Sequence, residues 1–296
     1  MSKKIILFTI VLGLGFTLAQ DLLKITGELE LHVLDIGQGD AIVLQTPEGH
    51  TILVDGGPGT GVLEELGDVL PFFDRTLDLL VLTHPHEDHV AGLVPVLDRF
   101  EVKGVLLSVP DYENKSYEAF LAQVAEEKIP VYFAEADRDF EFGSVTLDVL
   151  YPFEPVSGKL ENVNNASVVI RVVSGDDEIL LTGDAEQEVE AELLAAWNAG
   201  ELELEADILK AGHHGSRTSS TLEFLEAVDA KLMIISSGTG NDYGHPHEET
   251  LEKAADLGIE VLRTDLEGTI SIVLGEPHWL RSIFAPKLRS FSSRPS

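Results

Sequence analysis

The sequence predicts an α/β protein in which two β-sheets pack face to face and helices cover their outer sides. Short apolar segments bounded by glycine and proline recur along the chain, and segments of helical periodicity lie between them. The second half of the chain repeats the order of strands and helices found in the first half. Two sheets that each carry an apolar face are stable when they pack on one another with helices outside. The 296 residues, 44% of them hydrophobic, are enough to bury a large core.

The chain opens with a segment typical of an export signal. Lys3 and Lys4 precede an apolar stretch over residues 5–18, and Thr17-Leu18-Ala19 resembles a cleavage site before Gln20. We therefore expect residues 1–19 to be a signal peptide and the protein to be secreted or periplasmic, without stable membrane insertion after cleavage. The apolar stretch is shorter than the roughly 20 residues that span a bilayer. An uncleaved membrane anchor is the alternative.

The first half of the chain predicts three strands, then alternating helices and strands. Gly37-Gln38-Gly39 and Pro47-Glu48-Gly49 separate the first three strands, and the turn at Gly56-Gly57-Pro58-Gly59 precedes the first helix. The predicted elements are strands at 28–35, 41–46 and 50–54, a helix at 62–70, a strand at 77–83, a helix at 92–100, a strand at 103–109, a helix at 117–127 and a strand at 131–134.

The second half predicts the same succession and ends in a short polar tail. Its predicted elements are strands at 145–151, 167–173 and 178–181, a helix at 186–199, a strand at 207–210, a helix at 222–228, a strand at 232–235, a helix at 249–257, and strands at 260–263 and 269–274. Because no linker of disordered composition interrupts this pattern, we expect one domain over residues 27–285. The Ser, Arg and Pro content of residues 286–296 predicts a disordered tail.

Composition excludes several classes of function. The chain carries 20 basic and 52 acidic residues, a net charge of −32, which argues against broad electrostatic capture of nucleic acid or anionic membrane. It contains no cysteine, so disulfides and thiolate metal ligands are excluded. Any metal site must therefore do without thiolate ligands.

The sequence Thr83-His84-Pro85-His86-Glu87-Asp88-His89 carries the strongest chemical signal. It directly follows an apolar strand, and imidazole and carboxylate ligands suit zinc, manganese or iron. In an extended segment residues i and i+2 point the same way, so His84 and His86 can hold one ion. Asp88 and His89 fall where the chain turns into a helix, and they can reach a second ion. A polar loop with coincidental histidines is the alternative, which so dense a cluster disfavours.

Two further strands end in residues that suit the same chemistry. The strand ending in Gly183-Asp184 places a carboxylate at a sheet edge, where it can bridge two ions and offset their charge. Alternatively, Asp184 caps the helix that begins at Glu186. The next strand leads to His213 and His214. One of these two histidines is placed to complete the ligand set of an ion, and the other to orient substrate or water.

A fourth segment, Asn241-Asp242-Tyr243-Gly244-His245-Pro246-His247, adds a candidate proton donor. His245 can donate to a leaving group or a phosphoryl oxygen, with a surface turn as the alternative. Ser216 lies in a serine-rich segment that predicts a helix N-terminus, and free amides there suit an anionic oxygen.

Together these motifs make the chain resemble the metallo-β-lactamase-fold superfamily, and within it the hydrolase domain of the ComEC DNA-uptake proteins. A phosphorylcholine esterase of similar fold is a more distant likeness. The motifs that carry the resemblance are Asp35-Ile36-Gly37-Gln38-Gly39-Asp40-Ala41, Asp55-Gly56-Gly57, the cluster from His84 to His89, Asn164-Asn165-Ala166-Ser167, Thr182-Gly183-Asp184, His213-His214-Gly215-Ser216 and Gly244-His245-Pro246.

The resemblance implies a four-layer αββα sandwich with two divalent metal ions, zinc or manganese, at one edge. The implied ligands are His84 and His86 for one ion, Asp88, His89 and His214 for the other, and Asp184 between them. His213 is the less favoured ligand of the histidine pair. Many relatives have a third histidine for the first ion, where this chain has Asn164 or Asn165. The resemblance also implies that Asp35 and Asp55 brace the edge by hydrogen bonds.

The leading functional expectation is hydrolysis of a phosphodiester, DNA among the possible substrates, by metal-activated water. We expect Asp88, His213 and His245 to act in catalysis and Asn165, Ser216 and His245 to contact substrate. One rival is a lactonase or β-lactamase-type hydrolase with the same activated water. The other rival is a binding protein that retains the metal site without turnover. The sequence leaves the oligomeric state open.

Overall fold

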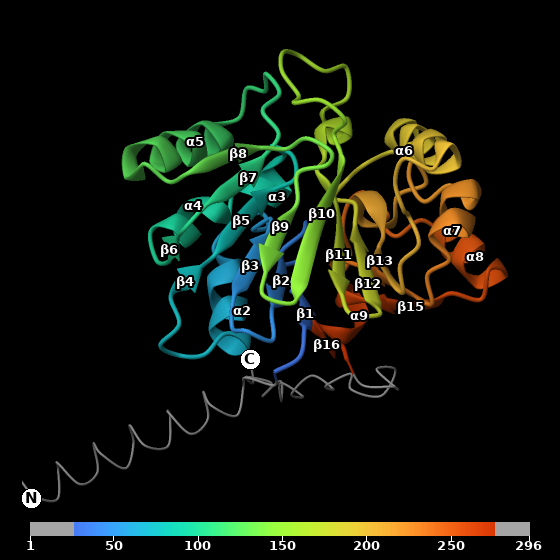
Figure 1. The fold of residues 1–296 in the computed structure, drawn as a ribbon, viewed down its shortest axis with the longest axis horizontal. Helices are drawn as coiled ribbons and strands as arrows, with labels where there is room; N and C mark the ends of the chain where they lie inside the picture. Colours follow the sequence, from blue (N-terminus) through green and yellow to red (C-terminus); the bar gives the residue numbers. More distant parts are fainter. Residues whose placement is uncertain (1–26, 276–296) are drawn as a thin grey trace, which may run out of the picture.

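The fold is a sandwich of two seven-stranded sheets with helices on both outer sides (Figure 1). The computed structural model describes residues 27–275. The predicted αββα architecture is confirmed. The predicted signal peptide at 1–19, the last residues of the predicted domain and the predicted tail at 286–296 lie outside the described residues.

The first sheet is built mainly from the first half of the chain. Its spatial order is β16-β1-β2-β3-β5-β7-β8, antiparallel through β3 and parallel from β3 to β8. The strands are β1 (Glu30–Val33), β2 (Ile42–Gln45), β3 (Thr51–Val54), β5 (Leu79–Leu82), β7 (Val105–Leu107), β8 (Val131–Phe133) and β16 (Ile270–Val273). Every residue of β5 is buried, as expected of a parallel strand covered on both faces.

The second sheet contains the strands of the second half, in the order β15-β14-β13-β12-β11-β10-β9. They are β9 (Phe140–Phe142), β10 (Val145–Tyr151), β11 (Val169–Ser174), β12 (Asp177–Leu181), β13 (Ile208–Lys210), β14 (Leu232–Ile235) and β15 (Glu260–Arg263). The segment from β12 to β15 is parallel.

Helices cover the outer face of each sheet (Figure 1). The helices of the first half are α2 (Gly61–Val69), α3 (Glu87–Val90), α4 (Leu93–Leu97) and α5 (Lys115–Glu127), and those of the second half are α6 (Gln187–Ala199), α7 (Leu222–Val228), α8 (Glu248–Asp256) and α9 (Thr264–Glu267). Three buried apolar clusters fill the space between the sheets and beneath the two helical layers. None of the helices in residues 27–275 combines the length and the apolar character that crossing a bilayer requires.

Several short elements differ from the sequence prediction. A two-stranded ribbon of β4 (Thr76–Leu77) and β6 (Glu101–Val102) and the strand β9 were not predicted. The predicted helix at 92–100 is only α4, because the chain turns after Leu97, where the backbone N–H groups of Arg99 and Phe100 both donate to the carbonyl oxygen of Val96. Two-residue strands leave too little periodicity to detect, so they become visible only when the partner strand is in place.

The parallel arrangement brings the chemical motifs to one edge of the sandwich. Strands β3 and β5 run parallel in the first sheet, and β12, β13 and β14 run parallel in the second. Each of these strands is followed directly by a polar motif of the sequence. Because the carboxyl ends of parallel strands meet at the same edge, residues more than 100 positions apart gather there.

A half-buried carboxyl group on β10 gives a pH-dependent prediction. Burial and the nearby carboxylate of Asp139 raise the pKa of Asp148, on β10, to about 6. Below the unfolded pKa of 3.8, Asp148 is protonated in both the folded and the unfolded state, so it does not lower the stability of the fold. As the pH rises from 3.8 through about 6, the unfolded state gives up the proton more readily than the folded state, and the free energy of unfolding falls. Asp148→Asn should therefore stabilise the protein at pH 8 by about 1 kcal/mol, a figure reduced for solvent screening, with no gain at pH 3.5.

Chemical denaturation at the two pH values measures this difference. Asp176→Asn, which removes the same charge from an exposed turn, is the matched control. Equal effects of both substitutions at pH 8 would show that only net charge matters.

Candidate metal centre

Asp55 fixes the segment that carries the first histidine cluster. This buried carboxylate follows β3 and accepts hydrogen bonds from the backbone N–H of Thr83 at 2.8 Å and from its hydroxyl at 2.7 Å. It also lies 2.8 Å from Nδ1 of His89. With Nδ1 donating to Asp55, the Nε2 atom of His89 is the one left for a ligand. Asp55 therefore braces the edge, as predicted, while Asp35 is exposed.

Asp184 reaches the same point from the second sheet. It follows β12 through Gly183, whose φ of 52° and whose short approach to Thr83 and Ser167 leave little room for a side chain. The Ser167 hydroxyl accepts a hydrogen bond from the backbone N–H of Asp184 at 3.0 Å. Gly183 therefore lets the two sheets approach closely enough for Asp184 to meet the histidines of β5.

His214 enters from a tight turn after β13. His213 and His214 both have left-handed backbone conformations, with φ of 47° and 56°. Such conformations are costly for residues other than glycine and cluster at functional sites. Nδ1 of His214 lies 3.1 Å from the carbonyl oxygen of Ser236 and 3.3 Å from Oδ1 of Asp40. These two acceptors hold the proton on Nδ1 and leave Nε2 directed at Asp88 and Asp184.

A buried ion pair lies behind His214. Nζ of Lys210 donates to Oδ2 of Asp40 at 2.8 Å, and both side chains are 1% exposed. Burial raises the pKa of Asp40, but the charges of Lys210 and His214 outweigh burial and lower it to about 2. Asp40 thus remains ionised and joins a loop of the first half of the chain to β13 of the second half.

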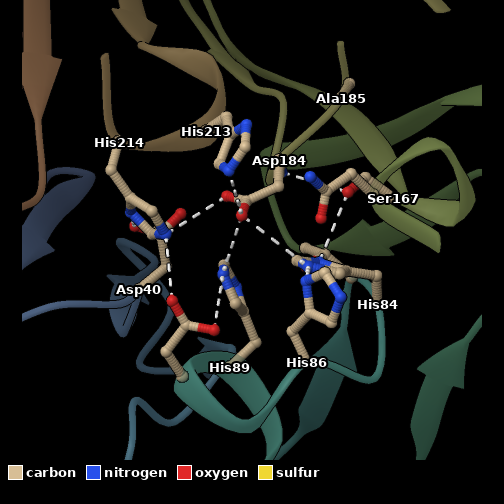
Figure 2. Close-up of polar contacts among 12 residues, drawn as sticks. Asp40, His84, His86, His89, Ser167, Asp184, Ala185, His213 and His214 are labelled. Atoms are coloured by element: carbon tan, nitrogen blue, oxygen red, sulfur yellow. Dashed lines mark hydrogen bonds and ion pairs between the residues drawn. The ribbon is translucent and has the colours of Figure 1, made fainter. Parts of the chain in front are cut away.

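Asp184 lies at the centre of the converging side chains, with His84, His89, His213 and His214 around it (Figure 2). Its Oδ2 atom is 3.7 Å from Nε2 of His84 and 3.4 Å from Nε2 of His89, and its Oδ1 atom is 3.4 Å from Nε2 of His214. The two carboxylate oxygens therefore face different histidines.

Two groups of possible ligands share this centre. In each group the ligand atoms lie within 4.8 Å of one another; the groups are His84 with His86 and Asp184, and Asp88 with His89 and His214. Nε2 of His214 is 3.4 Å from Oδ2 of Asp88. The structure thus brings together all six residues that the sequence predicted as metal ligands. Two other groups of this kind contain Asp40, whose oxygens face Lys210 and His214.

The unpaired polar atoms at the centre fit a cation. Nε2 of His89, Nε2 of His214 and Oδ1 of Asp184 are buried and have no hydrogen-bond partner. Buried polar atoms are nearly always paired, so three such atoms facing one another indicate a ligand. A divalent cation suits them because neutral imidazole and carboxylate are its usual ligands. The residues present therefore fit the metal ions that the motifs implied.

The pKa values describe the charge balance that a cation would meet. Burial lowers the pKa of His89 and His214, but Asp184 and the carboxylate behind each ring raise both pKa values well above the usual range. Burial raises the pKa of Asp184, and His214 and His89 overcome it and hold that pKa well below its usual range. Protons on the two imidazoles balance Asp184, and metal binding releases such protons.

A cavity of about 280 Å³ opens onto the centre. Asp88, His213 and His245, the predicted catalytic residues, all line it. Nδ1 of His213 lies 3.0 Å from Oε1 of Glu186, and its Nε2 lies 3.9 Å from Asp184. Burial and the charges of His213 and His214 lower the pKa of His245 to about 4. The ring of His245 is therefore neutral near pH 7.

Two predicted substrate contacts lie outside the lining of this cavity. Oδ1 of Asn165 accepts a hydrogen bond from the backbone N–H of Glu186 at 3.1 Å. Ser216 is 2% exposed, and its hydroxyl lies 3.1 Å from that of Thr218. Both side chains brace loops, so only His245 of the three predicted substrate residues faces the cavity.

Asn164 is one of the two asparagines that the family resemblance places at the position of a third histidine. Its Nδ2 donates to Oε1 of Glu186 at 2.8 Å, while its buried Oδ1 has no partner. Glu186 therefore connects Asn164 to His213. Glu186 and Lys210 are not among the sequence-predicted site residues, and neither are Tyr112 and Tyr243. An acidic helix start and a lysine at the end of a strand give no distinctive pattern on their own.

Comparison with known proteins identifies the family. Residues 34–238 match the model of the metallo-β-lactamase superfamily, so the chain belongs to this superfamily. It is 31% identical over 263 residues to ComE operon protein 3 of Bacillus subtilis, covering 83% of this chain and 33% of that protein. It is also 31% identical over 252 residues to competence protein ComA of Neisseria gonorrhoeae, covering 84% and 33% respectively. The chain thus spans about a third of the length of these relatives, and the predicted likeness to the ComEC branch is confirmed.

The fold has similar solved structures. CmlA, a diiron β-hydroxylase from Streptomyces venezuelae, matches with a TM-score of 0.55 at 17% identity, covering 83% of this chain and 54% of that chain. At this identity the likeness concerns the fold alone. Membership of the superfamily supports a metal-dependent hydrolase.

Proposed function

We propose that the chain is a phosphodiesterase that acts with two divalent cations, zinc or manganese, held at Asp184. The observation that carries this proposal is the position of the Asp184 carboxylate, which lies within 4 Å of histidines from both groups of candidate ligands: Oδ2 faces His84 and His89, and Oδ1 faces His214. The assigned ligands are His84 and His86 for one cation, Asp88, His89 and His214 for the other, and Asp184 for both. Bound cations would lower the pKa of water toward neutrality and offset charge on phosphoryl oxygens.

The residues around the cations have distinct tasks in this proposal. Glu186 and Thr218 hold Nδ1 of His213, at 3.0 and 3.1 Å, so that Nε2 faces the reacting group. With Nδ1 donating, Nε2 of His213 is a proton acceptor. Neutral His245 donates an N–H hydrogen bond to the departing oxygen. Positioned groups of this kind contribute roughly 10²- to 10⁴-fold in rate.

The choice of a phosphodiester rests on the competence relatives and on the charge of the site. Carboxylates and histidines are the charged or readily protonated side chains of the cavity lining, and no lysine or arginine from the described residues lines it. An anionic substrate therefore depends on the cations for its recognition, since a local field need not follow net charge. Export through residues 1–19 is part of this proposal and rests on the sequence.

Hydrolysis of bis-p-nitrophenyl phosphate, nitrocefin and an acyl-homoserine lactone by the manganese-loaded or zinc-loaded protein tests this proposal. We expect turnover of the phosphodiester alone, and a loss of at least roughly 10³-fold in Asp88→Ala, because a metal supplies several kcal/mol to such reactions. Asp98→Asn, an exposed aspartate in the turn after α4, is the control for altered charge. Turnover of nitrocefin or the lactone instead would favour the rival hydrolases. No turnover with any substrate would favour a binding protein.

A further inference from the structure

Two exposed phenylalanines form the tip of the loop between α2 and β4. The backbone N–H of Asp74 donates to the carbonyl oxygen of Pro71 at 2.9 Å, which closes a β-turn. Phe72 and Phe73 are the two central residues of this turn, and their side chains are 62% and 56% exposed. Such positions are usually held by glycine, proline, asparagine, aspartate or serine. Turn geometry therefore does not account for this pair of aromatic side chains.

The turn presents the two rings as one apolar surface. They contact each other edge to face, with centroids 5.0 Å apart. Oδ1 of Asp74 accepts a hydrogen bond from the backbone N–H of Thr76 at 3.0 Å. The next side chain along, Arg75, lies over the ring of Phe100 in a buried apolar cluster, 5.4 Å from its centroid. The turn is thus tied to the body of the protein, which reduces the entropy lost when a partner covers both rings.

This tip lies at the edge of the sandwich opposite the candidate metal centre. The loop leads into the start of β5, whose other end carries the histidine cluster. Strands β1 and β3 are both antiparallel to β2, so β1 starts at this opposite edge, and β16, antiparallel to β1, ends there. Figure 1 shows the loop from α2 to β4, the start of β1 and the end of β16 together at the lower end of the view. The described chain therefore begins and ends at the edge that carries the tip.

The sequences that adjoin this edge have the composition of segments that contact lipid. Residues 5–18, which precede β1, are apolar. Residues 276–296, which follow β16, contain a single acidic residue, the basic residues Arg281, Lys287, Arg289 and Arg294, and the aromatic residues Trp279, Phe284 and Phe291. Basic side chains are attracted to anionic headgroups, and tryptophan is enriched at the membrane–water interface. In a chain with a net charge of −32, this basic segment stands out, and it adjoins the exposed phenylalanines.

We propose that the tip formed by Phe72 and Phe73 inserts into the interfacial layer of a phospholipid bilayer, so that the protein lies on a membrane with its metal centre facing away from the lipid. A single apolar anchor binds a bilayer weakly and reversibly, and a second anchor or a basic segment stabilises the contact. The acidic surface of the rest of the chain limits the contact to this edge. The inference is independent of the proposed catalytic activity.

A second copy of the chain is the other occupant to consider for a small apolar surface. Stable protein–protein interfaces bury about 800 Å² and involve about 20–30 residues on each partner. The tip offers two large apolar side chains, and two copies that each carry a net charge of −32 repel one another. A bilayer needs no such area of complementary surface, because each apolar side chain that leaves water contributes on its own.

Sedimentation of the full-length protein with phosphatidylcholine vesicles, with and without phosphatidylglycerol, tests this inference. Complete burial of a phenylalanine side chain contributes roughly 10- to 100-fold to such an equilibrium. Both rings are already partly covered by protein, so the double substitution Phe72→Ser with Phe73→Ser should lower the partition coefficient by at least about tenfold. Phe133→Ser, which removes a 49% exposed ring from β8, is the matched control and should leave the partition coefficient unchanged.

A fluorescent label gives a second readout that reports the position of the tip itself. The chain contains no cysteine, so Phe73→Cys and Leu266→Cys can each carry one nitrobenzoxadiazole group. Leu266 is 70% exposed and lies on α9, which follows the carboxyl end of β15 at the edge of the metal centre. On addition of vesicles, emission from position 73 should increase and shift to the blue, whereas emission from position 266 should not change.

The outcomes distinguish the tip from the segments that adjoin it. Equal partitioning of the double variant and the unaltered protein would overturn the inference, because residues 5–18 or 276–296 would then account for all vesicle binding. Unchanged emission from position 73 would overturn it as well. A lower molecular mass of the double variant in solution, without any change in vesicle binding, would assign the tip to contact with a second copy. Neither readout uses hydrolysis, so failure of the proposed function would leave the inference standing.

Discussion

Asp184→Asn is expected to abolish hydrolysis and to prevent stable binding of both cations. The amide keeps the size of the side chain but loses the charge that faces His84, His89 and His214. Because a metal centre contributes several kcal/mol to the barrier and about 1.4 kcal/mol is a factor of ten, the rate should fall by at least roughly 10³-fold.

Thermal denaturation gives a second measurement that does not depend on substrate. A ligand present at a hundredfold excess over its Kd stabilises the native state by about 2.7 kcal/mol, which should raise the Tm by about 5 °C. Manganese should produce this increase in the unaltered protein and not in Asp184→Asn. Asp242→Asn, which changes an exposed aspartate beside Tyr243, should respond as the unaltered protein does. A normal Tm increase in Asp184→Asn would exclude the bridging role.

Lys210→Met is expected to lower the free energy of unfolding by about 3–5 kcal/mol, because it leaves the buried carboxylate of Asp40 without its partner. Methionine has a similar volume, so the loss does not arise from a cavity. Urea denaturation of the metal-free protein measures it. A loss below about 1 kcal/mol, the range of an exposed pair, would show that Asp40 finds another partner or takes up a proton.

The double substitution Lys210→Met with Asp40→Asn separates stability from metal binding. Removing both charges should restore most of the lost stability, since a neutral buried amide is far less costly than an unpaired charge. His214 would still lack its carboxylate, which lies 3.3 Å from Nδ1. Loss of such a partner typically weakens metal binding by about 10- to 100-fold. Normal manganese affinity in the stable double variant would show that Asp40 has no role in orienting His214.

The sequence was sufficient to predict the two-sheet architecture and the six candidate ligands. The strands are apolar runs bounded by glycine and proline, so their ends can be located in the sequence. The candidate ligands come soon after these ends, and their spacing along the chain therefore predicts which side chains lie on the same side. His84 and His86 could be paired from a two-residue spacing alone. The choice of His214 over His213 came from the family resemblance, and the structure adds that Nδ1 of His214 is held by Ser236 and Asp40.

The missed residues depend on contacts between distant parts of the chain. Lys210 and Asp40 are 170 positions apart and meet only when the two halves pack. Glu186 had no signal until Asn164 and His213 converged on it. Conversely, Asn165 and Ser216 lie in the right motifs, but their side chains bond to the backbone N–H of Glu186 and to the hydroxyl of Thr218 and do not line the cavity. Motif membership therefore identified the loops and not the direction of each side chain.

The central claim is that two cations share Asp184, and anomalous diffraction from crystals of the manganese-loaded protein tests it most directly. The expected map contains two peaks, one within bonding distance of His84 and His86, the other near Asp88, His89 and His214, with Asp184 contacting both. A single peak beside Asp40, or no peak near Asp184, would contradict it.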